Sequence, residues 1–310
     1  MNGHFAAFAN RRLTGLLIVL SMVVFLGCSS SRGVRRGPKS DENLVRTNRA
    51  AEIAFKNEKF SQAANLYRQV LKQAYIRDDL SAVVDAQYNL AVCQLKMDDC
   101  ERALERVHLA AGESAAGDRV TGADILLLEA TILYRLGKLN QAHQVTDEIL
   151  LLNQRPSAQV EAKTHFLRGV LADRRGDIDR LRSELEALNR VTGPGMAADR
   201  EELTGRLAMA ENRWHDAAGA FDRAAAQRRR DLDYRQMAEN LALAARASEQ
   251  AGKRRQAAKR YLRAGRSALL QGKNRQAQKW LNQASGLARQ AGDDFVVQQT
   301  HFYLKQIEPP

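Results

Sequence analysis

The sequence predicts an all-α protein whose helices pair into hairpins and stack as an α-solenoid of about 14 antiparallel helices. Its composition favours helix nearly throughout, because the 310 residues include only 5 Pro and 20 Gly. A small residue recurs at the start of successive expected helices, and another small residue precedes it by twelve positions. Each hairpin exposes apolar surface that its neighbours must cover, so we expect one continuous superhelix.

Residues 1–27 have the features of a cleaved export signal. Two arginines precede an apolar run, Leu16–Leu26, and Gly27 provides the small residue before Cys28. The run is shorter than the roughly 20 apolar residues that a membrane-spanning helix needs. The Gly27–Cys28 ending resembles the lipobox of bacterial lipoprotein signal peptides, although Phe25 stands where that family usually has leucine. The alternative is an ordinary signal peptide, or an uncleaved anchor, that happens to contain a cysteine.

The lipoprotein resemblance implies that Cys28 is acylated, with chains such as palmitate, and becomes the mature N-terminus. Several acyl chains anchor a protein durably, whereas one chain binds a membrane only marginally. In that family a serine after the cysteine is associated with the outer membrane, and Ser29 follows here. The resemblance therefore implies a protein that is lipid-anchored in the outer membrane and faces the periplasm. Residues 28–41 lack apolar periodicity, so the segment after the acylated cysteine is expected to be a disordered linker.

A motif of one hydrophobic or aromatic residue, two polar residues and an alanine recurs along the chain, with two weaker copies at its end. The fourth residue of each copy is called the anchor, and the anchors are Ala63, Ala103, Ala142, Leu181, Ala217, Ala257 and Ala277. Twelve residues before the first six anchors lie Ala51, Ala91, Ala130, Gly169, Gly205 and Ala245. Four residues after them lie Tyr67, Val107, Thr146, Leu185, Phe221 and Tyr261. Paired helices approach closely where both contribute small side chains, and larger residues fill the grooves beside the crossing.

This pattern resembles the tetratricopeptide repeat, a helix-turn-helix unit, over approximately residues 42–291. The resemblance implies a superhelix that binds a peptide or a partner helix in its concave groove. The first six anchors are separated by 40, 39, 39, 36 and 40 residues, whereas the family repeats about every 34 residues. The longer interval predicts extended helices or longer connections. The last interval is only 20 residues, which is a single helix.

The helical repeat domain is expected to span residues 42–307. Its hairpins are expected near 42–75, 79–112, 119–152, 157–190, 197–228 and 231–271, and two closing helices near 274–291 and 293–307. Apolar residues of the last helix, among them Phe295, Val296 and Phe302, are expected to seal the far end of the array.

Cys93 and Cys100 are the cysteines that remain once Cys28 is assigned to the lipid. They flank the expected turn of one hairpin, in a compartment where disulfides can form. A disulfide across this hairpin is one interpretation. The other is a pair of small buried apolar side chains.

The sequence carries no constellation that is typical of a catalytic, metal or cofactor site, so neither an enzyme activity nor a cofactor is expected. The six histidines are scattered, and none pairs with another at the spacing of metal ligands. Gly193, Pro194 and Gly195 lead to no P-loop lysine, and no pair of carboxylates stands out.

The C-terminal helices carry a strong positive charge. The chain has a formal net charge of +12, and between Glu249 and Asp293 eleven basic residues occur without an acidic one. Because the chain is expected to be exported, its positive charge predicts anionic lipid headgroups, wall polymers or acidic proteins as partners. No nucleic acid is expected as a partner. The candidate surface for an anionic partner consists of Arg255, Lys259, Arg260, Arg263, Arg266, Lys273, Arg275 and Lys279. The alternative is a solvated helix face whose long side chains cover apolar surface.

Two functions follow as hypotheses. The first is a lipid-anchored protein–protein interaction scaffold of a bacterial envelope, which would assist the assembly of an envelope or outer-membrane complex. The second is an electrostatic binding module for anionic envelope polymers or lipids, in which the repeats act as a spacer for the basic C-terminal helices. Ionic strength separates the two, because charge-driven docking weakens with added salt more than binding through apolar contacts does.

Overall fold

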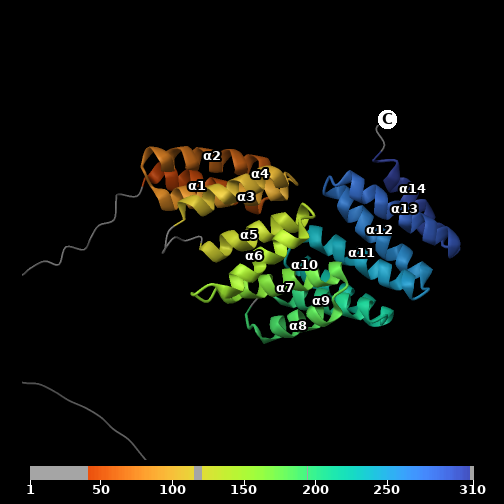
Figure 1. The fold of residues 1–310 in the computed structure, drawn as a ribbon. Coiled ribbons are helices and arrows are strands. Elements are labelled where there is room, and N and C mark those ends of the chain that lie inside the picture. The colour runs from red at the N-terminus through yellow and green to blue at the C-terminus, as the bar shows by residue number, and fades with distance from the viewer. Residues whose placement is uncertain (1–40, 115–120, 194, 308–310) are drawn as a thin grey trace, which may run out of the picture. The chain divides into compact units, whose positions relative to one another are not determined.

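The computed structural model describes residues 41–114, 121–193 and 195–307, and these residues contain fourteen α-helices (Figure 1). The predicted all-α array is therefore confirmed. The helices are α1 (Glu42–Lys56), α2 (Phe60–Ile76), α3 (Leu80–Lys96), α4 (Cys100–Glu113), α5 (Gly122–Arg135), α6 (Leu139–Leu151), α7 (Ala158–Arg175), α8 (Ile178–Arg190), α9 (Ala197–Ala210), α10 (Trp214–Arg230), α11 (Tyr234–Gln250), α12 (Arg254–Leu270), α13 (Asn274–Gln290) and α14 (Asp294–Leu304).

Much of the array is built from helices of 17 residues that are joined by turns of three residues. This regular helix and turn length explains the anchor interval of 40 residues, because one hairpin contains two helices and two turns. The observed helix ends lie within a few residues of the expected hairpins. None of the described helices combines the length and the apolar character needed to cross a membrane.

The three-residue turns share one conformation, in which the middle residue adopts positive φ. Asp98, for example, has φ 65°, and the next amide, that of Asp99, donates to the carbonyl of Gln94 at 2.9 Å. This bond satisfies one of the carbonyls that the end of a helix leaves without a partner. Glycine, asparagine and aspartate tolerate positive φ best. Leu232, with φ 59°, departs from this preference, because it is a branched apolar residue at the positive-φ position of its turn.

The anchors form the inner spine of the array. All seven have no exposed surface, including Leu181, which replaces the usual alanine. The small residues twelve positions earlier also lie in close contacts, but not always against the anchor. A Cβ on Gly169 would lie 2.7 Å from Leu203 of α9, the first helix of the next hairpin, and a Cβ on Gly205 would lie 2.7 Å from the ring of Phe221. At these two glycines the small residue makes room for a bulky side chain, which corrects the expected pairing of small with small.

The last helix closes the array only in part. Val296 is buried, whereas Phe295 and Phe302 keep 67% and 57% of their surfaces exposed. The expectation that these two phenylalanines seal the far end is therefore wrong, because they lie on the outward side of α14.

Buried ion pairs connect the helices in the middle of the array. Asp199 of α9 has no exposed surface, accepts from Lys163 of α7 at 2.7 Å, and also pairs with Arg228 of α10. Glu202, one turn further along α9, pairs with Arg206 at 2.8 Å. Each buried charge has an opposite charge beside it, as the cost of removing ions from water requires. The two pairs of Asp199 connect α9 to α7 and α10, whereas the pair of Glu202 with Arg206 lies within α9.

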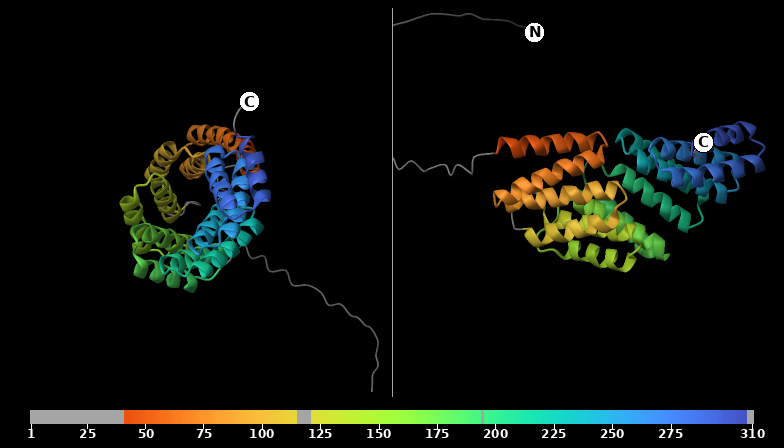
Figure 2. Two further views of the ribbon diagram at one scale, coloured as in Figure 1. Left: turned by 90° about the vertical axis from the view of Figure 1, so that its right-hand side faces the viewer. Right: turned by 90° about the horizontal axis from the view of Figure 1, so that it is seen from above.

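The superhelix comes round on itself, so that its first two hairpins meet its last helices (Figure 2). Asp98, in the turn between α3 and α4, accepts from Arg235 of α11 at 2.8 Å. Arg235 lies 137 positions after Asp98 in the sequence, so this contact joins distant parts of the superhelix. The turns of the first two hairpins face the turns that join the last hairpins. We call this junction the seam.

Candidate functional site

A cleft follows the seam, and its two walls come from opposite ends of the repeat array. The first wall is formed by the α1–α2 turn and the α3–α4 turn, which join the two helices within a hairpin. The second is formed by the α10–α11 and α12–α13 turns, which join one hairpin to the next. All four turns place their positive-φ residue on the cleft, namely Glu58, Asp98, Leu232 and Gly272.

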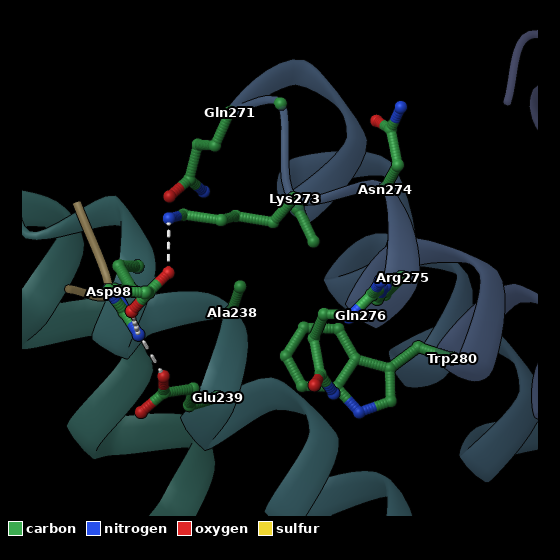
Figure 3. A pocket seen from close by; sticks show the side chains of 12 residues that line it. Asp98, Ala238, Glu239, Gln271, Lys273, Asn274, Arg275, Gln276 and Trp280 are labelled. Carbon is green, nitrogen blue, oxygen red and sulfur yellow. Dashed lines mark hydrogen bonds and ion pairs between the residues drawn. The ribbon is translucent and has the colours of Figure 1, made fainter. Parts of the chain in front are cut away.

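The seam cleft consists of two adjoining cavities. Cavity 1 has a volume of about 560 Å3 and extends from Asp98 to Trp280 (Figure 3). Cavity 2 has a volume of about 670 Å3 and extends toward the α1–α2 turn. Arg235, Gln271 and Lys273 line both cavities, so these three side chains lie where the two cavities adjoin. Volumes of several hundred Å3 are in the range that holds a small ligand or a few side chains of a partner.

Asp98 is the centre of the charged contacts across the seam. Its carboxylate accepts from Lys273 Nζ at 2.7 Å and from Arg235 Nη2 at 2.8 Å, and Arg135 of α5 lies 3.7 Å away. Burial by itself would raise the pKa of Asp98, but the hydrogen bonds from Lys273 and Arg235 outweigh it and lower the pKa below 3.8. Asp98 therefore carries its negative charge at neutral pH. Figure 3 shows Lys273 reaching across the recess toward it.

Further charges line cavity 1. Glu239 lies 3.5 Å from Arg235 Nε, and Arg275 lines the cavity from α13. Glu239 keeps 52% of its side-chain surface exposed. Its partial desolvation raises its pKa more than the charge of Arg235 lowers it. The cations Arg235, Lys273 and Arg275 outnumber the carboxylates of Asp98 and Glu239. Cavity 1 is therefore the more positive half of the cleft.

Apolar side chains lie beside these charges. Ala238, Ala268 and Trp280 line cavity 1, and Phe60, Met97, Leu232 and Tyr234 line cavity 2. Met97, Leu232 and Tyr234 are 37%, 64% and 41% exposed. A recess that combines accessible apolar surface with fixed charges is typical of a binding site. Among the residues that the structure describes, no group of three or more His, Cys, Asp or Glu is placed to hold a metal ion.

The eight residues of the candidate anionic-partner surface do not form one uniform patch. Arg260 binds Asp222 at 2.6 Å, and Lys273 binds Asp98 in the seam. Arg255 and Lys259 both approach Asp293, at 3.6 and 4.0 Å. The other four are exposed and make no ion pair with the part of the chain that the structure describes. These are Arg263, Arg266, Arg275 and Lys279.

The cysteines fall in different surroundings. Cys28 lies outside the described residues. Cys93 and Cys100 are free thiols, so of the two interpretations the structure does not contain the disulfide. The physical reason is their orientation, because Cys93 is buried in the core of α1–α3 and Cys100 packs against the core of α3–α5. Burial raises the pKa of Cys93 to about 11.

Sequence reasoning found Lys273 and Arg275 as basic residues but missed the seam itself. Asp98 lies in the expected turn between Cys93 and Cys100 but was not a candidate itself, and Arg235 belongs to no motif of the sequence. The one local signal is the recurrence of turns every 20 residues, which identifies Asp98, Leu232 and Gly272 as equivalent turn tips. It does not show that these tips face one another.

No protein-family model matches the chain, and no curated protein matches its sequence. Several solved structures share its fold. The apo form of RapI is 10% identical with a TM-score of 0.56, covering 86% of this chain and 97% of RapI. PilW, a widely conserved type IV pilus biogenesis factor, is 15% identical with a TM-score of 0.51, covering 72% and 92%. A tetratricopeptide repeat protein from Parabacteroides merdae is 13% identical with a TM-score of 0.50, covering 84% and 100%. The described residues therefore have the fold of a tetratricopeptide-repeat protein.

Proposed function

We propose that this chain is a lipid-anchored scaffold that binds a segment of a partner protein in the seam cleft, in a bacterial envelope. The observation that carries the proposal is the cleft itself, in which accessible Met97, Leu232 and Tyr234 lie beside fixed charges. An elongated recess with apolar and polar positions suits an extended peptide or a helix, whose side chains alternate in character. The likeness to PilW, a pilus biogenesis factor, supports a role in assembling an envelope structure.

Site-specific photo-crosslinking in cells tests whether the cleft binds a partner. A photoreactive amino acid replaces Leu232 in the cleft, and in a matched control it replaces Leu151, an exposed leucine that does not line the seam cleft. The proposal predicts a discrete crosslinked protein from position 232 that is absent from position 151. Equal crosslinking from both positions, or none from position 232, would contradict it.

The anchor is part of the same proposal and has its own test. Export, acylation of Cys28 and attachment to the outer membrane predict that the chain incorporates labelled palmitate and fractionates with the outer membrane. Cys28→Ala should abolish the labelling and release the chain from that fraction. A Cys28→Ala variant that remains membrane-bound would favour the uncleaved anchor.

A second candidate function is supported by the exposed cations of α12 and α13. Arg263, Arg266 and Lys279 have no ion pair among the described residues, so they are available to an anionic lipid or polymer. Triple substitution of these three residues by Glu should abolish binding to anionic vesicles at low salt. The crosslink from position 232 should survive, because the seam cleft lies elsewhere. Unchanged vesicle binding would remove this candidate.

A further inference from the structure

We propose that Arg235 and Lys273 form the docking point for an acidic segment of a protein partner, and that Asp98 occupies this point when no partner is bound. The inference rests on the proposed binding function of the seam cleft and adds the chemistry of the segment that enters it. It also assigns Asp98 a regulatory role, because Asp98 and the partner's carboxylate compete for the same two cations.

The first argument is that a carboxylate already sits at this point. Asp98 accepts a hydrogen bond from Lys273, in the turn between α12 and α13, at 2.7 Å and another from Arg235, at the start of α11, at 2.8 Å. Charge-assisted contacts of this length show that the two side chains are placed to hold a carboxylate. Nothing in the local sequence of the α3–α4 turn requires this, because Asp98 meets residues that are 137 and 175 positions away.

The second argument is that Asp98 does not use all of the available donors. Nη1 of Arg235 is buried and has no hydrogen-bond partner among the described residues. Arg275 lines the same cavity and forms no ion pair within the described part of the chain. A buried donor without a partner is costly. An incoming carboxylate can satisfy these donors together with Lys273, whereas the short side chain of Asp98 reaches only part of the set.

Asp98 is also easy to displace. It is the tip of a three-residue turn, and 46% of its side-chain surface is exposed. Ion pairs that remain in contact with water contribute little to stability. Exchange of Asp98 for another carboxylate therefore costs the fold little, and it breaks the contacts from Arg235 and Lys273 that bridge the two walls. Partner binding is expected to loosen the seam at this point.

The shape of the site favours a protein segment over a membrane or a simple polyanion. The cations lie inside a recess, which a flat membrane surface does not enter. Apolar side chains flank them on both sides, with Trp280 in cavity 1 and Leu232 and Tyr234 in cavity 2. Polyphosphate would leave these apolar positions without a contact. A segment with acidic and apolar side chains uses both.

Charge also sets the direction of the segment. Cavity 2 is lined by three carboxylates, those of Glu58, Asp231 and Asp233, in addition to Lys96 and the two shared cations. An acidic side chain is therefore expected in cavity 1, where Arg275 adds to the charges of Arg235 and Lys273. The apolar side chains of the segment are expected to lie over Leu232 and Tyr234.

Binding of a defined probe to the full-length protein in detergent tests the inference. The probe is a fluorescent peptide of glutamate and leucine residues, and its Kd is measured by anisotropy. Asp98→Asn removes the competing charge, and asparagine keeps the positive-φ turn. We expect this variant to bind the peptide about five times more tightly, and Lys273→Gln to bind it about ten times more weakly. In a Trp214→Phe background, Trp280 is the remaining tryptophan, and its emission should report entry of the peptide into cavity 1.

The matched control is Asp78→Asn. Asp78 occupies the same turn position between α2 and α3, with φ 53°, and the substitution changes the net charge equally. It does not line the seam cleft, so its Kd should equal that of the parent. Equal tightening by Asp98→Asn and Asp78→Asn would show a general charge effect and overturn the inference, as would an unchanged Kd for Asp98→Asn.

Two further arms identify the source of the anion. Polyphosphate and anionic lipid vesicles replace the peptide. We expect Asp98→Asn to leave the Kd for both of these ligands unchanged. If Asp98→Asn lowers the Kd for either ligand, and that ligand binds more tightly than the peptide, the assignment to an acidic protein segment is wrong. These measurements need no cellular partner, so they are independent of the crosslinking experiment. A missing crosslink contradicts the proposed function, whereas a Kd that does not respond to Asp98→Asn contradicts only the inference.

Discussion

Gly205 of α9 lies against the ring of Phe221 of α10, so closely that a Cβ on Gly205 would be 2.7 Å from Cε1. Phe221 is 1% exposed and has no space into which it can move freely. Gly205→Ala is therefore expected to destabilise the protein by about 1–3 kcal/mol through overpacking. Thermal and denaturant unfolding followed by circular dichroism measures the change.

Gly286→Ala is the control for that substitution. Gly286 lies on the exposed face of α13, and no atom is within 4 Å of the added methyl group. Alanine there should stabilise the helix by up to about 1 kcal/mol. Equal effects of the two substitutions would mean that the α9–α10 crossing is not as close as the structure shows.

The buried pair of Arg168 and Glu184 should be sensitive to the loss of one partner. Arg168 Nε donates to Glu184 at 2.8 Å, and their side chains are 4% and 5% exposed. Arg168→Met removes the most buried cation beside Glu184 but leaves Arg180 and His165 in contact with it. We therefore expect a loss of about 1.5–3 kcal/mol in the free energy of unfolding, the range for a hydrogen bond to a charged group. Arg102→Met is the control, because Arg102 is 73% exposed and its pair with Asp99 contributes little. Urea unfolding that gives similar values for both variants would contradict the predicted role of burial.

The same carboxylate predicts how stability depends on pH. Burial by itself would raise the pKa of Glu184, but hydrogen bonds from His165 and Arg168 outweigh it and lower the pKa below 4.5. A carboxylate whose pKa is lower in the folded state stabilises the fold above its unfolded pKa, and this contribution is lost as the pH falls through the folded value. We therefore expect the free energy of unfolding to fall with pH below about 4.5, and to fall less steeply in Glu184→Gln. If the free energy of unfolding fell equally with pH in both proteins, Glu184 would not contribute to the loss of stability in acid.

Leu232 is expected to show opposite effects on stability and binding. Its φ of 59° is unfavourable for a branched side chain, so Leu232→Gly should stabilise the protein by about 1 kcal/mol. Asn212→Gly is the control at the equivalent turn, with φ 60°, and should change stability less because asparagine tolerates this conformation. Leu232→Gly should also weaken binding of the acidic and apolar peptide, since the cleft loses an exposed apolar contact. A variant with parental Kd would show that Leu232 is not part of the site.

The two described cysteines should differ in reactivity. Cys93 has no exposed surface and burial raises its pKa to about 11, whereas Cys100 is half-buried. Because the thiolate is the reactive form, iodoacetamide should modify Cys100 well before Cys93 in the native protein. Peptide mass spectrometry without reduction measures both rates. A peptide that contains a Cys93–Cys100 disulfide would contradict the structure and support the bridge that the sequence suggested.

Much of the fold could be predicted because it depends on local pattern. The anchor alanines and the bulky residues four positions later recur at fixed spacing, and a buried helix crossing requires small and large side chains at just such positions. The partners of the small residues were harder to predict. Gly169 meets Leu203 of the following hairpin, and contacts between hairpins depend on the angle at which they stack.

The sequence by itself determined that this chain forms paired helices, where the hairpins begin and end, and that positive charge gathers on the last helices. Only the tertiary structure decided that Asp98 meets Arg235 and Lys273, and that these contacts line a cleft. The physical reason is the accumulation of small rotations, because each hairpin turns slightly relative to the previous one. The sum of these rotations over the array determines whether its two ends meet. The sequence around Asp98 contains no information about that sum.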